Sequence, residues 1–240
     1  MRLAIGLVAI MAAVLLSACG SSTPTRDDFV EIPDLGPTRI DVPRPTTDGI
    51  TCGLAFPAGE SVAERAAGLR RIGFFAELAD LSDADLGVVL DQAIAEEWGD
   101  SIDPDDSLHE LFVAERDTIR AWWRDLEADV FDGNGVYVAV LQEWATISAG
   151  AFAPTAIEET WESETGPVRV SFELDGARHV LEPEYIEDWI DPRIVTPINE
   201  LIAPSGRQFA FVTAFDQTAF VLALTDEERA ALENRGWCFE

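Results

Sequence analysis

The sequence contains no lysine and only two histidines among its 240 residues. Its 16 basic residues are therefore all arginine, and they face 45 acidic residues, which gives a formal net charge of −29. A surface with this charge repels the phosphates of nucleic acids and the headgroups of anionic lipids. We therefore expect no nucleic-acid partner. The acidic surface either attracts a cationic partner, such as a basic protein, or serves solubility alone.

The shortage of histidine also limits the metal and catalytic sites that the chain can form. Neither His109 nor His179 has a second histidine at ligand spacing, so the sequence predicts no zinc site. It contains no G-x-S-x-G motif and no phosphate-binding glycine loop. Residues 132–135 resemble the centre of a calcium loop, but Val130 and Leu141 stand where that loop needs acidic ligands. We therefore assign no cofactor, no metal and no catalytic residue from motifs.

Long apolar runs are also missing, since the longest covers only the fourteen residues 3–16. A transmembrane helix needs about 20 apolar residues. Arg2 precedes the run and Leu16-Ser17-Ala18-Cys19 ends it, which is typical of a secretory signal. This ending resembles the lipobox of bacterial lipoproteins.

The lipobox resemblance implies that residues 1–18 are a removed signal peptide and that Cys19 carries the lipid. The protein would then be extracytoplasmic and anchored to the cell membrane or outer envelope, because two acyl chains suffice for stable anchoring. The alternative is an ordinary signal peptide with an incidental cysteine.

Cysteine is scarce, with three in the chain. Once Cys19 is lipidated, Cys52 and Cys238 remain, and an even number of cysteines in an oxidising compartment indicates a disulfide. Two buried free thiols are the alternative.

Composition divides the remaining chain into a tether and a folded part. Residues 19–49 are rich in proline and threonine and show no sustained helical or strand period, so we interpret them as a flexible tether. Residues 50–150 are predicted to be mainly helical. Residues 151–240 are predicted to contain an antiparallel sheet with helices, forming one folded unit with 50–150.

Three serines mark predicted helix starts in the first half of the folded part. Ser61 and Ser82 begin capping patterns. Ser107 is predicted to open a helix that continues to Leu126, with Trp122 on its apolar stripe. Trp123 falls off that stripe, so we consider it a candidate for a groove or an interface, with core packing as the alternative.

In the second half of the folded part, apolar and polar residues alternate as they do in half-buried β-strands. Residues 168–174 and 177–181 are predicted to form a hairpin that turns at Asp175-Gly176. Further segments are predicted as strands at 157–162, 208–213 and 218–224. Helices are predicted from Asp191-Pro192 to Ile202 and after Thr225. The order is a helical region followed by β-β-α-β-β-α, which predicts an α+β fold with an antiparallel sheet backed by helices.

Two stretches, "VYVAVLQEWATISAGAFAPTAIEETW" and "GPVRVSFELDGARHVLEPEYIEDWID…FDQTAFVLALTDEERAALENRGWCF", resemble a group of uncharacterised bacterial proteins. They span residues 136–239, and the second also resembles small α+β immunity-type domains. The resemblance implies no activity and no functional residues.

We hypothesise a lipid-anchored, non-catalytic binding module of the envelope, of immunity or inhibitor type. The alternative is a hydrolase of envelope polysaccharide that uses a carboxylate pair near the tryptophans. Inward-facing carboxylates in a tryptophan-lined cleft would favour the hydrolase, and a flat or convex acidic face would favour the binding module.

Overall fold

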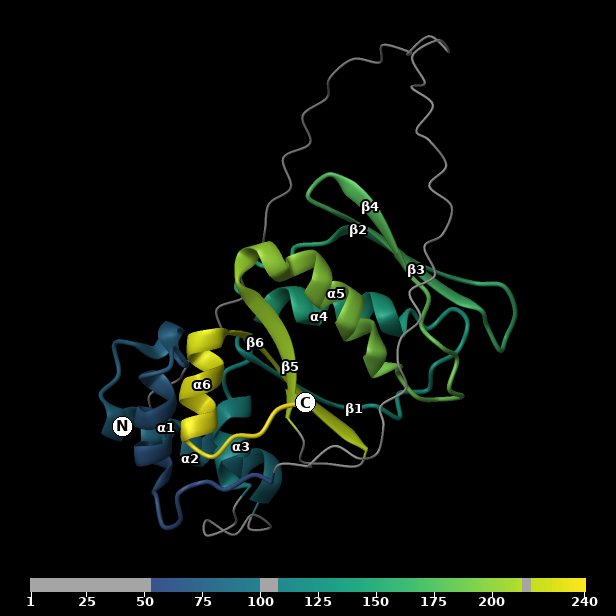
Figure 1. Ribbon diagram of the computed structural model, residues 1–240. Helices are drawn as coiled ribbons and strands as arrows, with labels where there is room; N and C mark the ends of the chain where they lie inside the picture. The colour runs from purple at the N-terminus through teal and green to yellow at the C-terminus, as the bar shows by residue number, and fades with distance from the viewer. Residues whose placement is uncertain (1–52, 100–107, 213–216) are drawn as a thin grey trace, which may run out of the picture. The chain divides into compact units, whose positions relative to one another are not determined.

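The computed structural model describes residues 53–99, 108–212 and 217–240 (Figure 1). The predicted signal peptide and tether, together with Cys19 and Cys52, lie outside these residues. Helices and antiparallel strands occur together, which confirms the predicted α+β class. None of the helices in the described ranges has the length and apolar character needed to cross a bilayer.

Three helices open the described chain: α1 (Val62–Arg70), α2 (Asp83–Trp98) and α3 (His109–Glu115). The side chain of Ser61 accepts a hydrogen bond from the N–H of Glu64, and the Glu64 carboxylate accepts one from the N–H of Ser61. Ser82 caps α2 through the N–H of Asp85. Both predicted helix starts are therefore confirmed, because side chains satisfy N–H groups that the first turn leaves unpaired.

The predicted long helix from Ser107 to Leu126 is wrong. Helix α3 ends at Glu115, and residues Ala121–Asp125 form strand β1. In β1, Trp122 pairs with Val221 and Trp123 with Phe220 of strand β6. Consecutive side chains of a strand point to opposite faces, so the two tryptophans enter different cores. A short apolar segment is compatible with both the helical and the strand period of apolar residues. Pairing with β6 makes residues 121–125 a strand.

Strand β1 belongs to a sheet with the order β1–β6–β5, where β5 is Arg207–Val212 and β6 is Thr218–Thr225. The central strand β6 is buried from Ala219 to Leu224. Both of its faces are covered, which explains why its sequence is a continuous apolar run without alternation.

The outer edge of β5 is covered by other parts of the chain. The Asn199 side chain donates to the carbonyl of Phe209 at 2.8 Å and accepts from its N–H at 2.7 Å. Further along, the N–H of Glu240 donates to the carbonyl of Phe211 at 3.0 Å. These contacts occupy edge groups that would otherwise be open to another strand.

A second sheet has the order β2–β3–β4, with β2 at Thr155–Trp161, β3 at Val168–Leu174 and β4 at Ala177–Leu181. The β3–β4 hairpin and its turn confirm the prediction, since Asp175 and Gly176 have φ of 52° and 77°. The single predicted sheet is corrected to two. The chain after β4 forms helix α5 (Val195–Ile202), and β5 then pairs with β6 rather than with β4.

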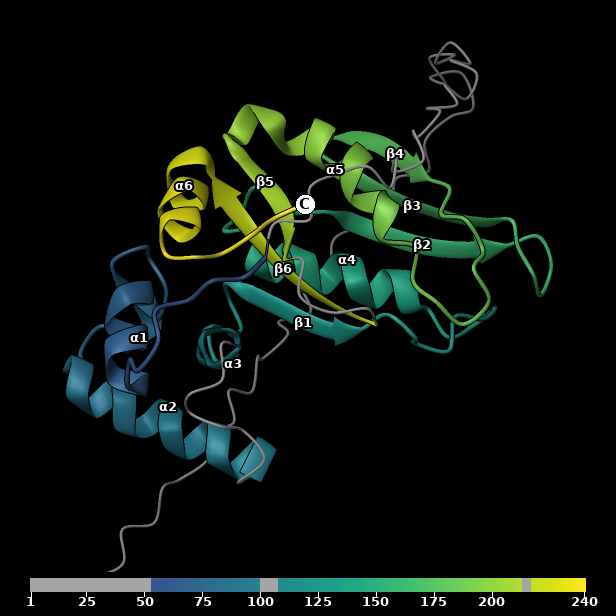
Figure 2. The ribbon, with the colours of Figure 1, turned by 60° about the horizontal axis from the view of Figure 1, so that its bottom comes forward.

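Helices α4 (Val136–Ile147) and α5 lie between the two sheets (Figure 2). Their apolar side chains join both sheets in a central core, whose members include Trp122, Tyr137, Leu141, Trp144, Phe152, Phe172, Ile198, Phe209 and Val221. The other face of β1–β6–β5 packs on α1, α2, α3 and α6 (Asp226–Asn234) in a helical core, which includes Leu69, Leu86, Leu111, Phe220, Leu222, Leu232 and Trp237.

Candidate functional site

A groove of about 560 Å³ lies between α2, the end of α3, β1 and α4. Helix α2 contributes Val89 and Ala93, and β1 contributes Trp122 and Trp123. Val89 is 47% exposed, so an apolar side chain faces the open space. We call this feature the tryptophan groove. It exists because β1 leads away from α3 as a strand, which brings both tryptophans beside α2 and α4.

The lining of the groove includes two carboxylates that share a single guanidinium. Arg116 lies 2.5 Å from Glu97 and 2.7 Å from Glu115, measured between nitrogen and oxygen. Burial raises the pKa of Glu115, and the neighbouring Arg116 partly opposes this effect. The site therefore contains a carboxyl group whose negative charge is poorly solvated.

A further carboxylate of the groove is Glu143 of α4. The indole Nε1–H of Trp122 donates to Glu143 at 2.5 Å, and Arg124 donates to the other carboxylate oxygen at 3.1 Å. Trp122 itself is almost completely buried. Glu143 thus orients the tryptophan and remains accessible at the surface, with 38% of its side chain exposed.

Trp123 forms the aromatic wall of the groove. Its ring centroid lies 5.2 Å from that of Phe112, 5.4 Å from Phe220 and 6.1 Å from Trp98. Aromatic rings at such distances stabilise one another beyond the area that they bury. The structure places Trp123 between the helical core and the groove, and its role in an interface stays a prediction.

A smaller hollow of about 140 Å³ adjoins the groove and shares Arg116 and Leu78 with it. Asp117 lines this hollow, and burial raises the pKa of its carboxyl group. Asp117 also accepts a hydrogen bond from the N–H of Phe75, a residue with a φ of 58°. Asp117 therefore holds a strained turn in place, which is a structural task.

The histidines and residues 132–135, which resemble part of a calcium loop, do not line the groove. His109 is buried in α3, and the His179 ring lies 5.6 Å from that of Phe172. Residues 132–135 form the turn that leads into α4. Within residues 53–99, 108–212 and 217–240, no group of three or more His, Cys, Asp or Glu side chains is placed to hold a metal ion.

Cys238 is buried near the start of the described chain. The N–H of Ala55 donates to the carbonyl of Gly236 at 2.9 Å, and the rings of Phe56 and Trp237 lie 5.5 Å apart. Cys52 precedes Ala55 by three residues, a span of at most about 11 Å. This arrangement is compatible with a Cys52–Cys238 disulfide, which stays a prediction because Cys52 lies outside the described residues.

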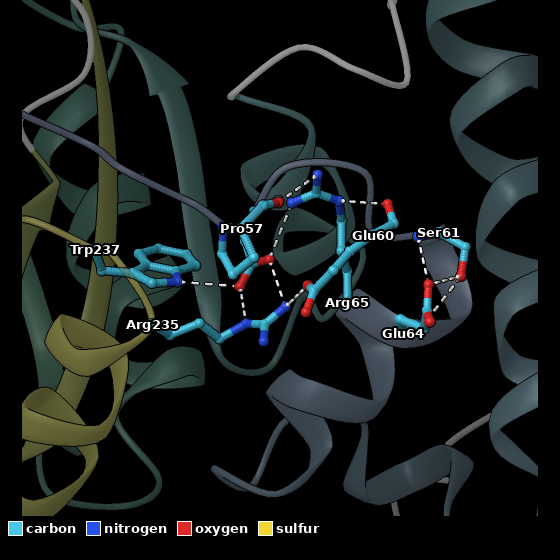
Figure 3. Close-up of polar contacts among 8 residues, drawn as sticks. Pro57, Glu60, Ser61, Glu64, Arg65, Arg235 and Trp237 are labelled. Carbon is cyan, nitrogen blue, oxygen red and sulfur yellow. Dashed lines mark hydrogen bonds and ion pairs between the residues drawn. The ribbon is translucent and has the colours of Figure 1, made fainter.

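A second polar cluster centres on Glu110 of α3, whose side chain is fully buried. Arg235 donates to it at 2.5 and 2.9 Å, Arg65 at 3.4 Å and the Trp237 indole at 3.3 Å. Figure 3 shows Arg65, Arg235 and Trp237 directed to the same place. The sequence analysis missed this cluster, because a glutamate on a short amphipathic helix ordinarily faces solvent.

The comparisons with known proteins found no matching family model, no matching curated protein and no matching solved structure. The resemblance of residues 136–239 to uncharacterised bacterial proteins, and of the second stretch to immunity-type domains, stays a prediction.

Proposed function

We propose that the protein is a lipid-anchored, non-catalytic binding module of the bacterial cell envelope, and that the tryptophan groove is its binding site. The supporting observation is the composition of the groove: an apolar and aromatic wall beside carboxylates that are paired with arginines. Ligand sites are typically apolar hollows of about 300–1,000 Å³ with a few placed polar groups.

The ion pairs favour binding over hydrolysis. Glu97 and Glu115 share Arg116, and Glu143 bonds Arg124. A glycosidase needs two carboxyl groups that both face the scissile bond, whereas each of these carboxylates is paired with an arginine side chain.

Photo-crosslinking in cells tests the groove directly. A benzoylphenylalanine at Val89 should capture an envelope component, whereas the same group at Val180 should not. Val180 is a matched control because it is 50% exposed on β4, in the other sheet. Equal capture at both positions, or capture at neither, contradicts the groove as the binding site.

The lipid anchor is proposed from Leu16–Cys19 and is tested separately. Replacing Cys19 with alanine should abolish acyl labelling and release the protein from the membrane fraction. A Cys19→Ala protein that stays in the membrane fraction with unchanged labelling would disprove the anchor.

A hydrolase is the second candidate, and the raised pKa of Glu115 in a tryptophan-lined groove is the observation that favours it. A buried carboxyl group of this kind can act as a general acid. The full-length protein is incubated with envelope polysaccharide, and new reducing ends are measured. Release by the wild type but not by Glu115→Gln would replace the binding proposal with a hydrolase.

A further inference from the structure

The tryptophan groove has fewer positive than negative side chains. Glu97, Glu115 and Glu143 line it, against Arg116 and Arg124. Arg116 is shared by Glu97 and Glu115, so the two arginines of the groove face three carboxyl groups. The chain as a whole carries a net charge of −29, which adds a long-range attraction for cations.

Two of the three carboxylates are accessible to an incoming ligand. The Glu97 side chain is 52% exposed and uses its Oε2 for Arg116. Glu143 is partly exposed and uses one oxygen for Arg124 and the other for Trp122. An ionised carboxylate has about four acceptor positions, so both side chains can accept further N–H donors.

The walls of the groove suit a charged group on an apolar stem. Val89 and Ala93 offer apolar surface on α2, and Trp123 offers an aromatic surface on β1. Arginine lays its methylene stem along apolar surface, and its planar guanidinium stacks on aromatic rings while donating to carboxylates. Lysine has a compact, strongly hydrated charge and lacks this planar fork.

We infer that the tryptophan groove binds an arginine side chain of a basic protein partner, with the guanidinium at the carboxylates and the stem against Val89. This inference rests on the proposed function, because it names the ligand of the same groove. The basic partner supplies the opposite charge to the acidic surface, and complementary charge raises the rate of encounter.

A pair of short peptides tests the inference against the full-length protein in detergent. The first is acetyl-Gly-Arg-Leu-Gly-amide, and the second replaces arginine with citrulline, which has nearly the same shape but no charge. Calorimetric titration should show the arginine peptide binding up to about fivefold more tightly than the citrulline peptide. Its affinity should also fall as the salt concentration rises.

Two glutamate variants locate the binding. Glu97→Gln should weaken binding of the arginine peptide about threefold or more. Glu182→Gln should leave the affinity for the arginine peptide unchanged. Glu182 is a matched control because its side chain is 58% exposed and paired with Arg169 at 3.1 Å, and because it directly follows β4. Equal affinity for the two peptides, or equal effects of the two variants, overturns the inference.

The outcome is separable from that of the proposed function. If Val89 still crosslinks a component while the arginine peptide neither binds nor competes, the groove remains the binding site and the arginine inference is wrong. If the arginine peptide binds with the expected selectivity and suppresses crosslinking at Val89, the inference is supported. Loss of groove-specific crosslinking contradicts both.

Discussion

Replacing Glu110 with glutamine should destabilise the protein more than any exposed glutamate replacement. The side chain of Glu110 is 0% exposed and that of its partner Arg65 is 1% exposed. Glutamine keeps the volume but removes the charge and offers a single acceptor oxygen. Arg65 and Arg235 would then lose the carboxylate that compensates both of their charges.

The size of the effect follows from what each arginine retains. Arg235 keeps Glu60 at 2.5 Å, which limits its loss. Arg65 keeps two carbonyl acceptors, those of Pro57 and Glu60 at 3.3 and 3.2 Å, which carry no negative charge. Removing one partner of a buried ion pair costs about 3–5 kcal/mol. For a folded unit of this size, that lowers the melting temperature by about 6–20 °C.

Denaturant and thermal unfolding of the full-length protein, followed by circular dichroism, measure this effect. Glu182→Gln is the control and should change the free energy of unfolding by less than about 0.5 kcal/mol. A Glu110→Gln protein that unfolds within about 1 kcal/mol of the wild type would refute the reasoning. It would mean that water reaches the cluster and screens the arginine charges.

Three further predictions concern the hairpin, the groove and the cysteines. Phe172→Ala should cost about 3–5 kcal/mol, because the ring is fully buried, whereas Glu173→Ala should cost within about 0.5 kcal/mol; a reversed order in unfolding experiments would contradict the register. Burial raises the pKa of Glu115 above its ordinary 4.5, so the folded state holds this proton more tightly than the unfolded chain, and stability is lost as pH rises above 4.5. The glutamine in Glu115→Gln carries no charge, so the melting temperature of this variant minus that of the wild type should become more positive from pH 4.5 to 7. A difference that stays constant or falls over this range would show that burial of the Glu115 carboxyl group does not make stability depend on pH. Intact-mass measurement with and without reductant should show a disulfide between Cys52 and Cys238, which two alkylated thiols in unfolded, non-reduced protein would disprove.

Local sequence patterns predicted those elements whose stability is local. The serine caps of α1 and α2 and the capping box of Thr225 before α6 involve residues three apart. The β3–β4 turn needs positive φ at two adjacent residues, which Asp175-Gly176 supplies. The patterns failed at β1, where an apolar stretch after α3 was compatible with both helix and strand.

The candidate site could be predicted only in part. Trp123 was singled out because it did not fit a helical stripe, and the structure places it in the wall of the groove. The reason behind that choice was wrong, since the segment is a strand. Glu97, Glu115 and Glu143 gave no signal among 45 acidic residues, because nothing in the sequence indicates which carboxylates converge in space.

The α+β class, the capped helices and the hairpin could be predicted from residue patterns, because hydrogen bonds and dihedral preferences within a few residues are sufficient for these. Tertiary structure decided the strand at Trp122 and Trp123, whose pairing partner lies about a hundred residues later in β6. It also decided the burial of Glu110, whose charge is compensated by Arg65 from α1 and Arg235 near the C-terminus. The groove is likewise a product of packing, since its walls come from α2, the end of α3, β1 and α4, which are separate in the sequence.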